Sequence, residues 1–221
     1  MEAFKLLSGR FGHLKYLMGQ LMKKIAVMVS GGGSNMQSIA DSANRGILKG
    51  LAEVALVISN NPDAYALERA KKGNIKALCI ERKNYADELS FNREILKKLE
   101  ENRIDIVCLA GYMRMIGKNI VGRYAGRILN IHPALLPKFG GKGMYGRRVH
   151  EAVVEAKEKK SGATVHYVDD NYDTGEIIIQ TEVDVFENDT PLDLAERVLK
   201  EEHKIYPEAI KKVIEKLNKE V

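Results

Sequence analysis

The chain has 221 residues, enough for one large domain or two small ones with a substantial core. Its hydrophobic share of 45% and charged share of 29% are typical of a soluble globular protein, and no apolar stretch is long enough for a membrane helix. The net charge is +5, but glutamates accompany the lysines along helix patterns such as EAVVEAKEKK, which argues against nucleic-acid binding. A modest positive excess suits a small anionic substrate.

Residues 1–22 precede the regular pattern and form an N-terminal extension, expected to be either an extra helix or a disordered segment. They lack the compact apolar core and small-residue cleavage site of a secretory signal. Cys79 and Cys108 each lie in a predicted strand, so we expect two buried, reduced thiols instead of a disulfide or metal pair. These features predict a cytoplasmic protein.

From Lys23 onward, short β-branched runs alternate with amphipathic stretches. The repeated order of strand, helix and strand predicts an α/β fold, a mostly parallel, Rossmann-like open sheet with helices on both faces. The predicted strands and helices of this part occupy residues 23–30, 34–46, 52–59, 64–73, 75–80, 88–102, 105–111 and 127–132.

The pattern changes in the C-terminal part of the chain. Residues 162–168 and 176–185 have the pattern of two strands, and the loop between them is too short for a crossover, so an antiparallel hairpin is expected. A long final helix begins near Pro191 and is expected to be interrupted near Pro207. No internal repeat or low-complexity linker divides the chain, so residues 23–221 are expected to form a single domain.

The stretch VMVSGGGSNMQ places glycines between a predicted strand and a predicted helix, where backbone amides can approach a phosphate. No Gly-Lys-Ser/Thr follows, so it is not a P-loop. A dinucleotide fingerprint would need glycine at Met36 and an acid at the end of the next strand, where Ser59, Asn60 and Asn61 stand. What remains is a mononucleotide-sized phosphate site with Ser34 as helix cap and donor, or simply a tight, well-capped turn.

Asn130 and His132 end a predicted parallel strand, and side chains two residues apart point the same way. Open α/β sheets bind ligands at this end of their strands, and an asparagine amide beside an imidazolium can stabilise an oxyanion. The loop VDDNYDTGE supplies Asp169, Asp170 and Asp173, and a carboxylate beside His132 would raise its pKa and keep it charged. A capped strand end and plain turn chemistry are the alternatives. No residue set has metal-ligand spacing, and no Gly-x-Ser-x-Gly elbow is present.

Four stretches together resemble one enzyme family. SGGGSN, LAGYMRMI, ILNIHPALLPKFGG and VDDNYDTGEII occur in the order and spacing of the glycinamide ribonucleotide formyltransferases, which are folate-dependent enzymes of purine synthesis. The similarity runs from about Lys24 to the C-terminus. The Asn-x-His-Pro-x-Leu-Leu-Pro motif with a downstream aspartate is similar to that of the wider superfamily that uses 10-formyltetrahydrofolate, and the glycine-rich Ser-Asn loop resembles the glycinamide ribonucleotide branch.

The resemblance implies transfer of the formyl group of 10-formyltetrahydrofolate to the amine of 5-phosphoribosylglycinamide in IMP synthesis, without a metal. Asn130 and His132 would bind the formyl oxygen, and Asp173 would hold His132 charged and help move protons through a water. Residues 23–125 would form the nucleotide-phosphate half and residues 126–221 the folate and catalytic half. The nucleotide would be bound by Gly33, Ser34, Asn35, Lys200, Glu201 and Glu202. The folate would lie against Met113, Arg114, Met115, Ile116, Asn130, Asp169, Asp170, Asn171 and Tyr172.

The chain departs from the family pattern in two places. Glu88 stands where some members carry an arginine that meets the folate glutamate tail, and Arg82, Lys83 and Arg93 are candidates for that role here. The segment GGKGMYGRRVH differs from the Pro-Gly-containing form of other members and is expected to change a loop over the site.

Three other functions fit the sequence less well. A formyltetrahydrofolate deformylase resembles this chain but carries an additional N-terminal domain, and a methionyl-tRNA formyltransferase carries a C-terminal RNA-binding domain. A non-catalytic nucleotide-binding module would not need the oxyanion site. His166 is expected to be structural, whereas His150 and His203 are left unassigned. We expect a monomer or homodimer with small-molecule substrates and no nucleic-acid or membrane partner.

Overall fold

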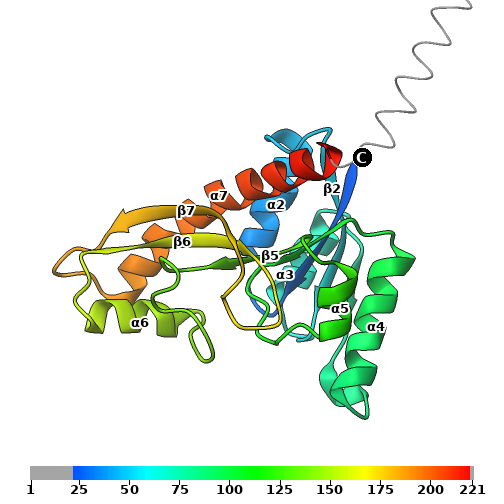
Figure 1. Cartoon of the computed structure of the whole chain (residues 1–221), viewed down its shortest axis with the longest axis horizontal. Helices are drawn as coiled ribbons and strands as arrows, with labels where there is room; N and C mark the ends of the chain where they lie inside the picture. The colour runs from blue at the N-terminus through cyan, green and yellow to red at the C-terminus, as the bar shows by residue number, and fades with distance from the viewer. Residues whose placement is uncertain (1–21, 220–221) are drawn as a thin grey trace, which may run out of the picture.

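The computed structural model describes residues 22–219, so the expectations for residues 1–21 lie outside the described part. The strands form one seven-stranded sheet in the order β3-β2-β1-β4-β5-β6-β7 (Figure 1). Strands β1 to β5 pair in parallel, and β6 and β7 add an antiparallel hairpin, which confirms the predicted fold class. The strands are β1 Lys23–Val29, β2 Ala52–Ser59, β3 Ala77–Cys79, β4 Ile106–Leu109, β5 Ile128–His132, β6 Lys160–Tyr167 and β7 Ile177–Asp184.

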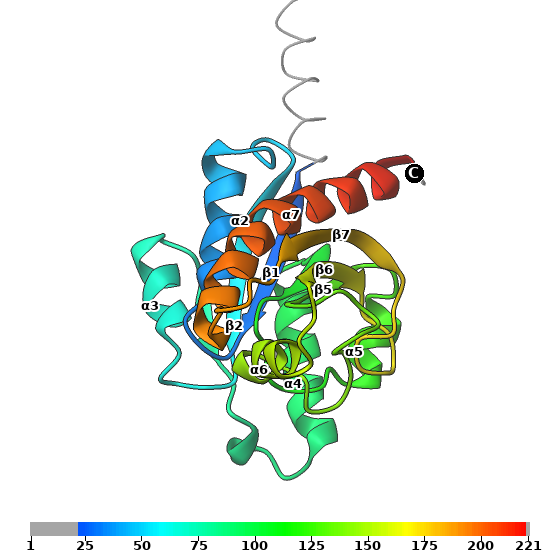
Figure 2. The same ribbon diagram turned by 90° about the vertical axis from the view of Figure 1, so that its left-hand side faces the viewer.

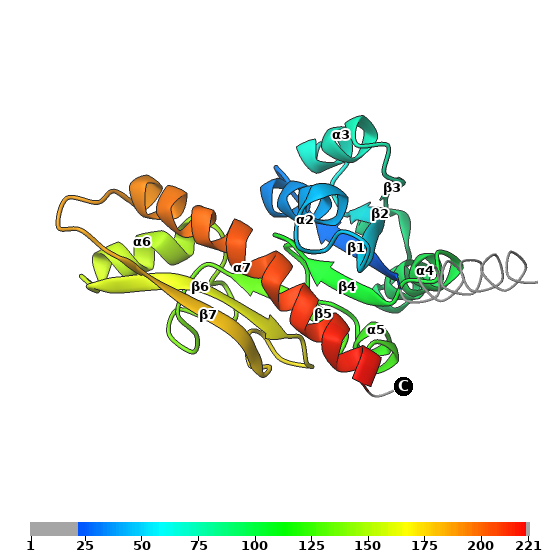
Figure 3. The same ribbon diagram turned by 90° about the horizontal axis from the view of Figure 1, so that it is seen from above.

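Helices cover both faces of the sheet. One core cluster includes buried side chains of α2, α3, α6 and α7, and the other includes those of α4 and α5. Figure 2 shows α2 and α7 side by side, and Figure 3 shows α7 running across the sheet. No helix among residues 22–219 is both long and apolar enough to cross a membrane. The helices are α2 Ser34–Arg45, α3 Tyr65–Lys72, the 3-10 helix η1 Arg82–Asn84, α4 Glu88–Glu101, α5 Lys118–Arg123, α6 Arg147–Glu155 and α7 Pro191–Lys219.

Neighbouring strands β1 and β4 form the point where the strand order reverses, because β1 is followed by β2 on one side and β4 by β5 on the other. Ligands of open α/β sheets bind in the crevice at such a point. The Ser30 amide donates to the Gly111 carbonyl at 3.1 Å, and the Met113 amide donates to Ser30 Oγ at 2.8 Å. The glycine-rich turn and the segment after β4 are therefore held together at the crevice.

Helix α7 is continuous through Pro207, so the predicted interruption is wrong. Proline has no amide hydrogen to donate to the carbonyl four residues before it, here that of His203. Ser38 Oγ on α2 donates to this carbonyl at 2.8 Å and replaces the missing helical bond. The buried Tyr206 hydroxyl lies 2.9 Å from the Leu109 carbonyl oxygen and 3.1 Å from that of Leu129. These contacts dock α7 against α2, β4 and β5.

The two cysteines differ in solvent exposure. Cys108 is buried in the central strand β4, as expected, and burial raises its pKa to about 12. Cys79 is exposed, so the prediction that both thiols are buried is wrong for this residue. It ends β3, a three-residue strand at the edge of the sheet, where the strand is only partly covered.

Candidate active site

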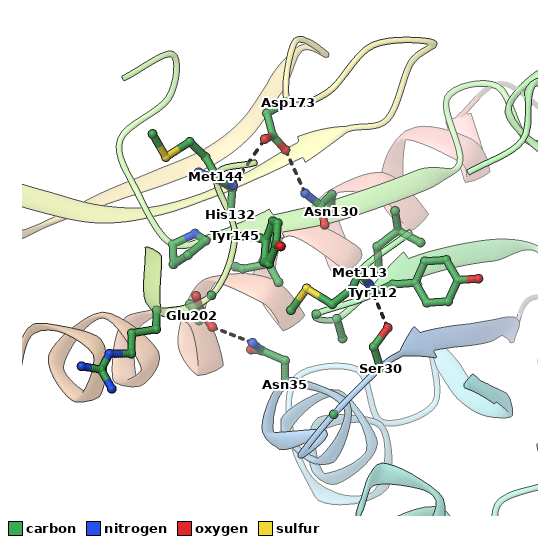
Figure 4. Close-up of a pocket in the computed structure, with 18 of the residues that line it drawn as sticks. Ser30, Asn35, Tyr112, Met113, Asn130, His132, Met144, Tyr145, Asp173 and Glu202 are labelled. Carbon is green, nitrogen blue, oxygen red and sulfur yellow. Dashed lines mark hydrogen bonds and ion pairs between the residues drawn. The ribbon is translucent and has the colours of Figure 1, made fainter. Parts of the chain in front are cut away.

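A cavity of about 810 Å³ opens at the carboxyl ends of the parallel strands (Figure 4). The turn after β1, the segment after β4 and the end of β5 form its floor. The loop before α6, the loop between β6 and β7, and one face of α7 form its remaining walls. The lining residues are distributed over the segments 30–35, 109–116, 130–133, 141–150, 166–173 and 190–202, and not every residue of these segments is among them.

The glycine turn delivers the N-terminus of α2 to the cavity. The cap is Gly33, with φ 73° and ψ 29°, and Ser34 is the first helical residue, so the expectation of a Ser34 cap is wrong. A Cβ atom at Gly33 would lie 2.5 Å from the Cβ of Ala66, which, together with the positive φ, explains the glycine. Because the first amides of a helix have no helical acceptors, this turn can bind an anion.

Asn35 and Glu202 form a buried pair across the cavity floor, from α2 and α7. Asn35 Nδ2 donates to Glu202 Oε2 at 2.6 Å. Burial raises the pKa of Glu202 to about 7 because it disfavours the carboxylate, and the Asn35 hydrogen bond acts in the opposite direction. Asn35 Oδ1 is buried without a partner among the described residues, so the pair retains a free acceptor for a ligand.

Asn130, at the end of β5, lies within reach of two acceptors. Its Nδ2 lies 3.3 Å from Asp173 Oδ1 and 3.1 Å from His166 Nε2. His166 Nδ1 lies 2.7 Å from the Tyr167 carbonyl oxygen, which can only accept, so Nδ1 is the donor and Nε2 accepts from Asn130. Asp173 has φ 55°, an uncommon value for a residue with a side chain, and it also accepts from the Gly141 amide at 2.9 Å.

His132 lies beside Asp173 but is not held charged by it. Its Nδ1 is 3.6 Å from Asp173 Oδ2, and its Nε2 donates to the Phe139 carbonyl at 2.8 Å. Burial lowers the pKa of His132, and the opposing effect of Asp173 does not overcome it. The expectation of a raised His132 pKa is therefore wrong for the ligand-free protein. The neutral ring leaves Nδ1 as a free proton acceptor facing a carboxylate.

Known proteins resemble this chain in sequence and in fold. Residues 23–210 match the formyl transferase family model. The chain belongs to the formyl transferase family. Phosphoribosylglycinamide formyltransferase of Haemophilus influenzae is 40% identical over 190 residues, covering 86% of each chain. The crystal structure of glycinamide ribonucleotide transformylase 1 from Symbiobacterium toebii matches with a TM-score of 0.83 and 41% identity, covering 88% of each chain.

Some relatives of this chain are longer than the chain itself. The chloroplastic phosphoribosylglycinamide formyltransferase of Arabidopsis thaliana is 45% identical over 195 residues, which is 87% of this chain and 66% of the relative. The chain spans 14% of the insect trifunctional purine biosynthetic proteins that it matches. The resemblance to glycinamide ribonucleotide formyltransferases that the sequence motifs indicated is confirmed.

Most residues that this family resemblance implied do line the cavity. These are Gly33, Ser34, Asn35, Met113, Arg114, Met115, Ile116, Asn130, His132, Asp169, Asn171, Tyr172, Asp173 and Glu202. Lys200 and Glu201 do not, and Glu201 instead pairs with Lys204 at 2.7 Å. Residues three apart share a helix face, so Leu199 lies beside Glu202 on the cavity side. Asp170 also lies outside the lining.

The segment after β4 has one charged side chain in the cavity wall. Arg114 lies over the Phe91 ring, with 5.4 Å between its guanidinium carbon and the ring centre, and is ion-paired with Glu88. Glu88 also pairs with Arg82 at 3.0 Å. Glu88 therefore lies between two arginines, and this end of the cavity is less cationic than the sequence of the segment indicates.

Several lining side chains were not predicted as site residues, among them Tyr145, His150 and His166. His166 pairs directly opposite Asn130 in the antiparallel ladder, so a correct register for the hairpin would have found it. His150 is buried on α6, and burial together with the charge of nearby His132 lowers its pKa to about 4. No group of His, Cys, Asp and Glu within residues 22–219 is arranged to hold a metal ion.

Proposed function

We propose that this chain transfers the formyl group of 10-formyltetrahydrofolate to the amine of 5-phosphoribosylglycinamide in purine (IMP) biosynthesis. The observation that carries the proposal is a cavity lined by Asn130, His132 and Asp173 and also by the glycine turn at the N-terminus of α2. The names of the relatives at about 40% identity support the same reaction. Binding alone would not require a donor, a proton acceptor and a carboxylate at one point.

In the proposed reaction the substrate amine attacks the formyl carbon, and the carbonyl electron pair moves onto oxygen. Asn130 Nδ2 donates to this oxyanion after exchanging one of its present acceptors, Asp173 or His166. Collapse of the intermediate breaks the bond between the formyl carbon and the folate nitrogen. The products are formylated glycinamide ribonucleotide and tetrahydrofolate.

His132 is proposed to carry the proton. The amine loses a proton as it attacks, and the neutral ring accepts it at Nδ1, directly or through a water. Asp173 Oδ2, 3.6 Å away, stabilises the imidazolium that forms. The proton then passes to the folate nitrogen as that nitrogen leaves. Neutral His132 in the ligand-free protein is therefore the state that the reaction needs at its start.

The two halves of the domain are proposed to divide the substrates. Residues 23–125 contribute the glycine turn for the phosphate, and Glu202 reaches it from α7 to accept from the ribose hydroxyls. Residues 126–221 contribute the catalytic groups. The folate is proposed to lie between the 169–172 loop and the apolar side chains of Met113, Met115 and Ile116. The cytoplasmic location and a monomer or homodimer remain predictions.

The proposal is tested by incubating the protein with 10-formyltetrahydrofolate, with and without glycinamide ribonucleotide, and measuring tetrahydrofolate and free formate. We expect tetrahydrofolate release that requires the nucleotide and yields no formate. Formate release without the nucleotide would identify a deformylase, and no turnover would indicate a binding module. Asp173→Asn should lower kcat by about 10²–10³-fold. Asp63→Asn, at an exposed acid outside the cavity lining and outside the folate loop, is the control and should leave kcat unchanged.

A further inference from the structure

The loop before α6, residues 139–146, lines the cavity and is hydrogen-bonded to the catalytic groups at its start. At its start, the Phe139 carbonyl accepts from His132 Nε2 and the Gly141 amide donates to Asp173 Oδ2. At its end, Tyr145 and Gly146 line the same cavity as Met113 of the segment after β4. We call residues 139–146 the strap. The start of the strap is therefore held by the catalytic groups.

Tyr145 is the aromatic residue of the strap that lines the cavity. The residue is 47% exposed, and the Arg148 guanidinium lies 5.1 Å from the ring centre. Figure 4 shows Tyr145 between Asn130 and His132 on one side and Glu202 and Asn35 on the other. In the proposed function this is the path of the nucleotide, from its phosphate and ribose to the reacting amine.

The other aromatic side chains of the described cavity wall lie elsewhere. Tyr112 belongs to the segment after β4 and Tyr172 to the loop between β6 and β7, the two walls proposed to hold the folate. Among the described lining residues, Tyr145 is the tyrosine that belongs to neither of these two walls, and no phenylalanine or tryptophan is among them. An exposed ring in that position offers a flat face with little rotamer freedom to lose.

We propose that Tyr145 is a nucleotide-binding residue whose ring packs over the ribose and glycinamide of the substrate and directs the amine toward the formyl group. This inference rests on the proposed function. The strap that carries Tyr145 is hydrogen-bonded to His132 and Asp173 through the Phe139 carbonyl and the Gly141 amide, so the ring belongs to a loop that contacts the reaction centre.

The test compares Tyr145→Ala and Tyr145→Phe with Lys142→Ala, a change at an exposed residue of the same strap that is outside the cavity lining. Tyr145→Ala should raise the KM for the nucleotide about tenfold and leave the KM for 10-formyltetrahydrofolate within twofold. Tyr145→Phe, which keeps the ring, and Lys142→Ala should retain wild-type constants. Calorimetric titration of glycinamide ribonucleotide without folate should show the same tenfold loss in Tyr145→Ala.

Three outcomes overturn the inference. Wild-type nucleotide affinity in folded Tyr145→Ala would show that the ring does not contact the nucleotide. A raised KM for the folate with an unchanged KM for the nucleotide would place the ring in the folate-binding part of the cavity. Equal losses in Tyr145→Phe and Tyr145→Ala would show that the hydroxyl, not the ring, binds. Wild-type turnover is measured in the same assay. If the wild type does not turn over, the proposed reaction is wrong; if only the Tyr145 variants behave unexpectedly, the proposed role of Tyr145 is wrong.

Discussion

Asn35 donates a 2.6 Å hydrogen bond to Glu202, and this contact joins α2 to α7 although 167 residues separate the two in the chain. Both side chains are buried. The pKa of Glu202 is about 7, so near neutrality the carboxyl is close to half protonated in the ligand-free protein. A nucleotide whose hydroxyls donate to the carboxylate would favour its charged form.

The first prediction concerns Glu202→Gln, which should stabilise the ligand-free protein at pH 8. The folded pKa is raised, so the favourable protonated state is present below the unfolded pKa of about 4.5 and is lost as pH rises through 7. At pH 8 this loss amounts to about 3 kcal/mol. Glutamine keeps an acceptor for Asn35 without ionising. Thermal melts should show a higher Tm than wild type at pH 8 and a similar Tm at pH 4.

Glu201→Gln, on the neighbouring face of α7, is the control and should not change the pH dependence of Tm. Glu202→Gln should also raise the nucleotide KM, because a carboxylate acceptor is lost. A Tm at pH 8 below that of wild type would contradict a buried, destabilising charge.

The second prediction uses Ser38 and Pro207 as a double-mutant cycle. Ser38→Ala should destabilise the protein by about 1 kcal/mol, because the His203 carbonyl loses its donor. In a Pro207→Ala background the new amide at position 207 can donate to that carbonyl, so the same change should have a smaller effect. Urea denaturation of the four proteins measures the coupling. Equal effects of Ser38→Ala in both backgrounds would show that the serine does not replace the helical bond.

The third prediction is a loss of stability in acid through His150. Its folded pKa of about 4 lies below the unfolded value of 6.5, so its contribution is fully present above pH 6.5 and is lost as pH falls through 4. Between pH 7 and pH 4.5 the wild type should lose about 2 kcal/mol that His150→Gln does not. Denaturant titrations at the two pH values measure this difference. Parallel losses in both proteins would mean that His150 is accessible to protons while folded.

The fourth prediction compares alanine substitutions at two adjacent glycines of the proposed phosphate turn, Gly32 and Gly33. Gly33→Ala should destabilise by about 2 kcal/mol and raise the nucleotide KM, because φ is 73° and the new Cβ would lie 2.5 Å from that of Ala66. Gly32→Ala is the control, since a Cβ there meets no atom within 4 Å. Denaturation and steady-state kinetics of the two variants test the pair. Tolerance of Gly33→Ala would show that the turn can adopt another conformation.

The fold was predictable because its signals are local. Alternating β-branched and amphipathic stretches located five parallel strands, and the short loop after β6 required a hairpin. The side-by-side placement of Asn130 and His132 followed from the period of two in a strand, and both line the cavity.

Other features depend on contacts between distant elements. The lowered pKa of His132 comes from burial, whereas from the sequence only the neighbouring charge was considered. His166 becomes a partner of Asn130 through the register of β5 and β6. The continuity of α7 through Pro207 depends on a serine of another helix. Lys200 and Glu201 were expected at the nucleotide from the family resemblance, but neither is part of the cavity lining.

The docking of α7 also determines when the nascent chain can complete the cavity during synthesis. The glycine turn, the segment after β4 and the strap all leave the ribosome well before Glu202 and Tyr206 do, because synthesis runs from the N-terminus. Until α7 emerges, Asn35 has no carboxyl partner and the carbonyls of Leu109 and Leu129 lack the tyrosine hydroxyl. A nascent chain therefore gains its complete cavity in one late step, when the last helix has been translated and has docked.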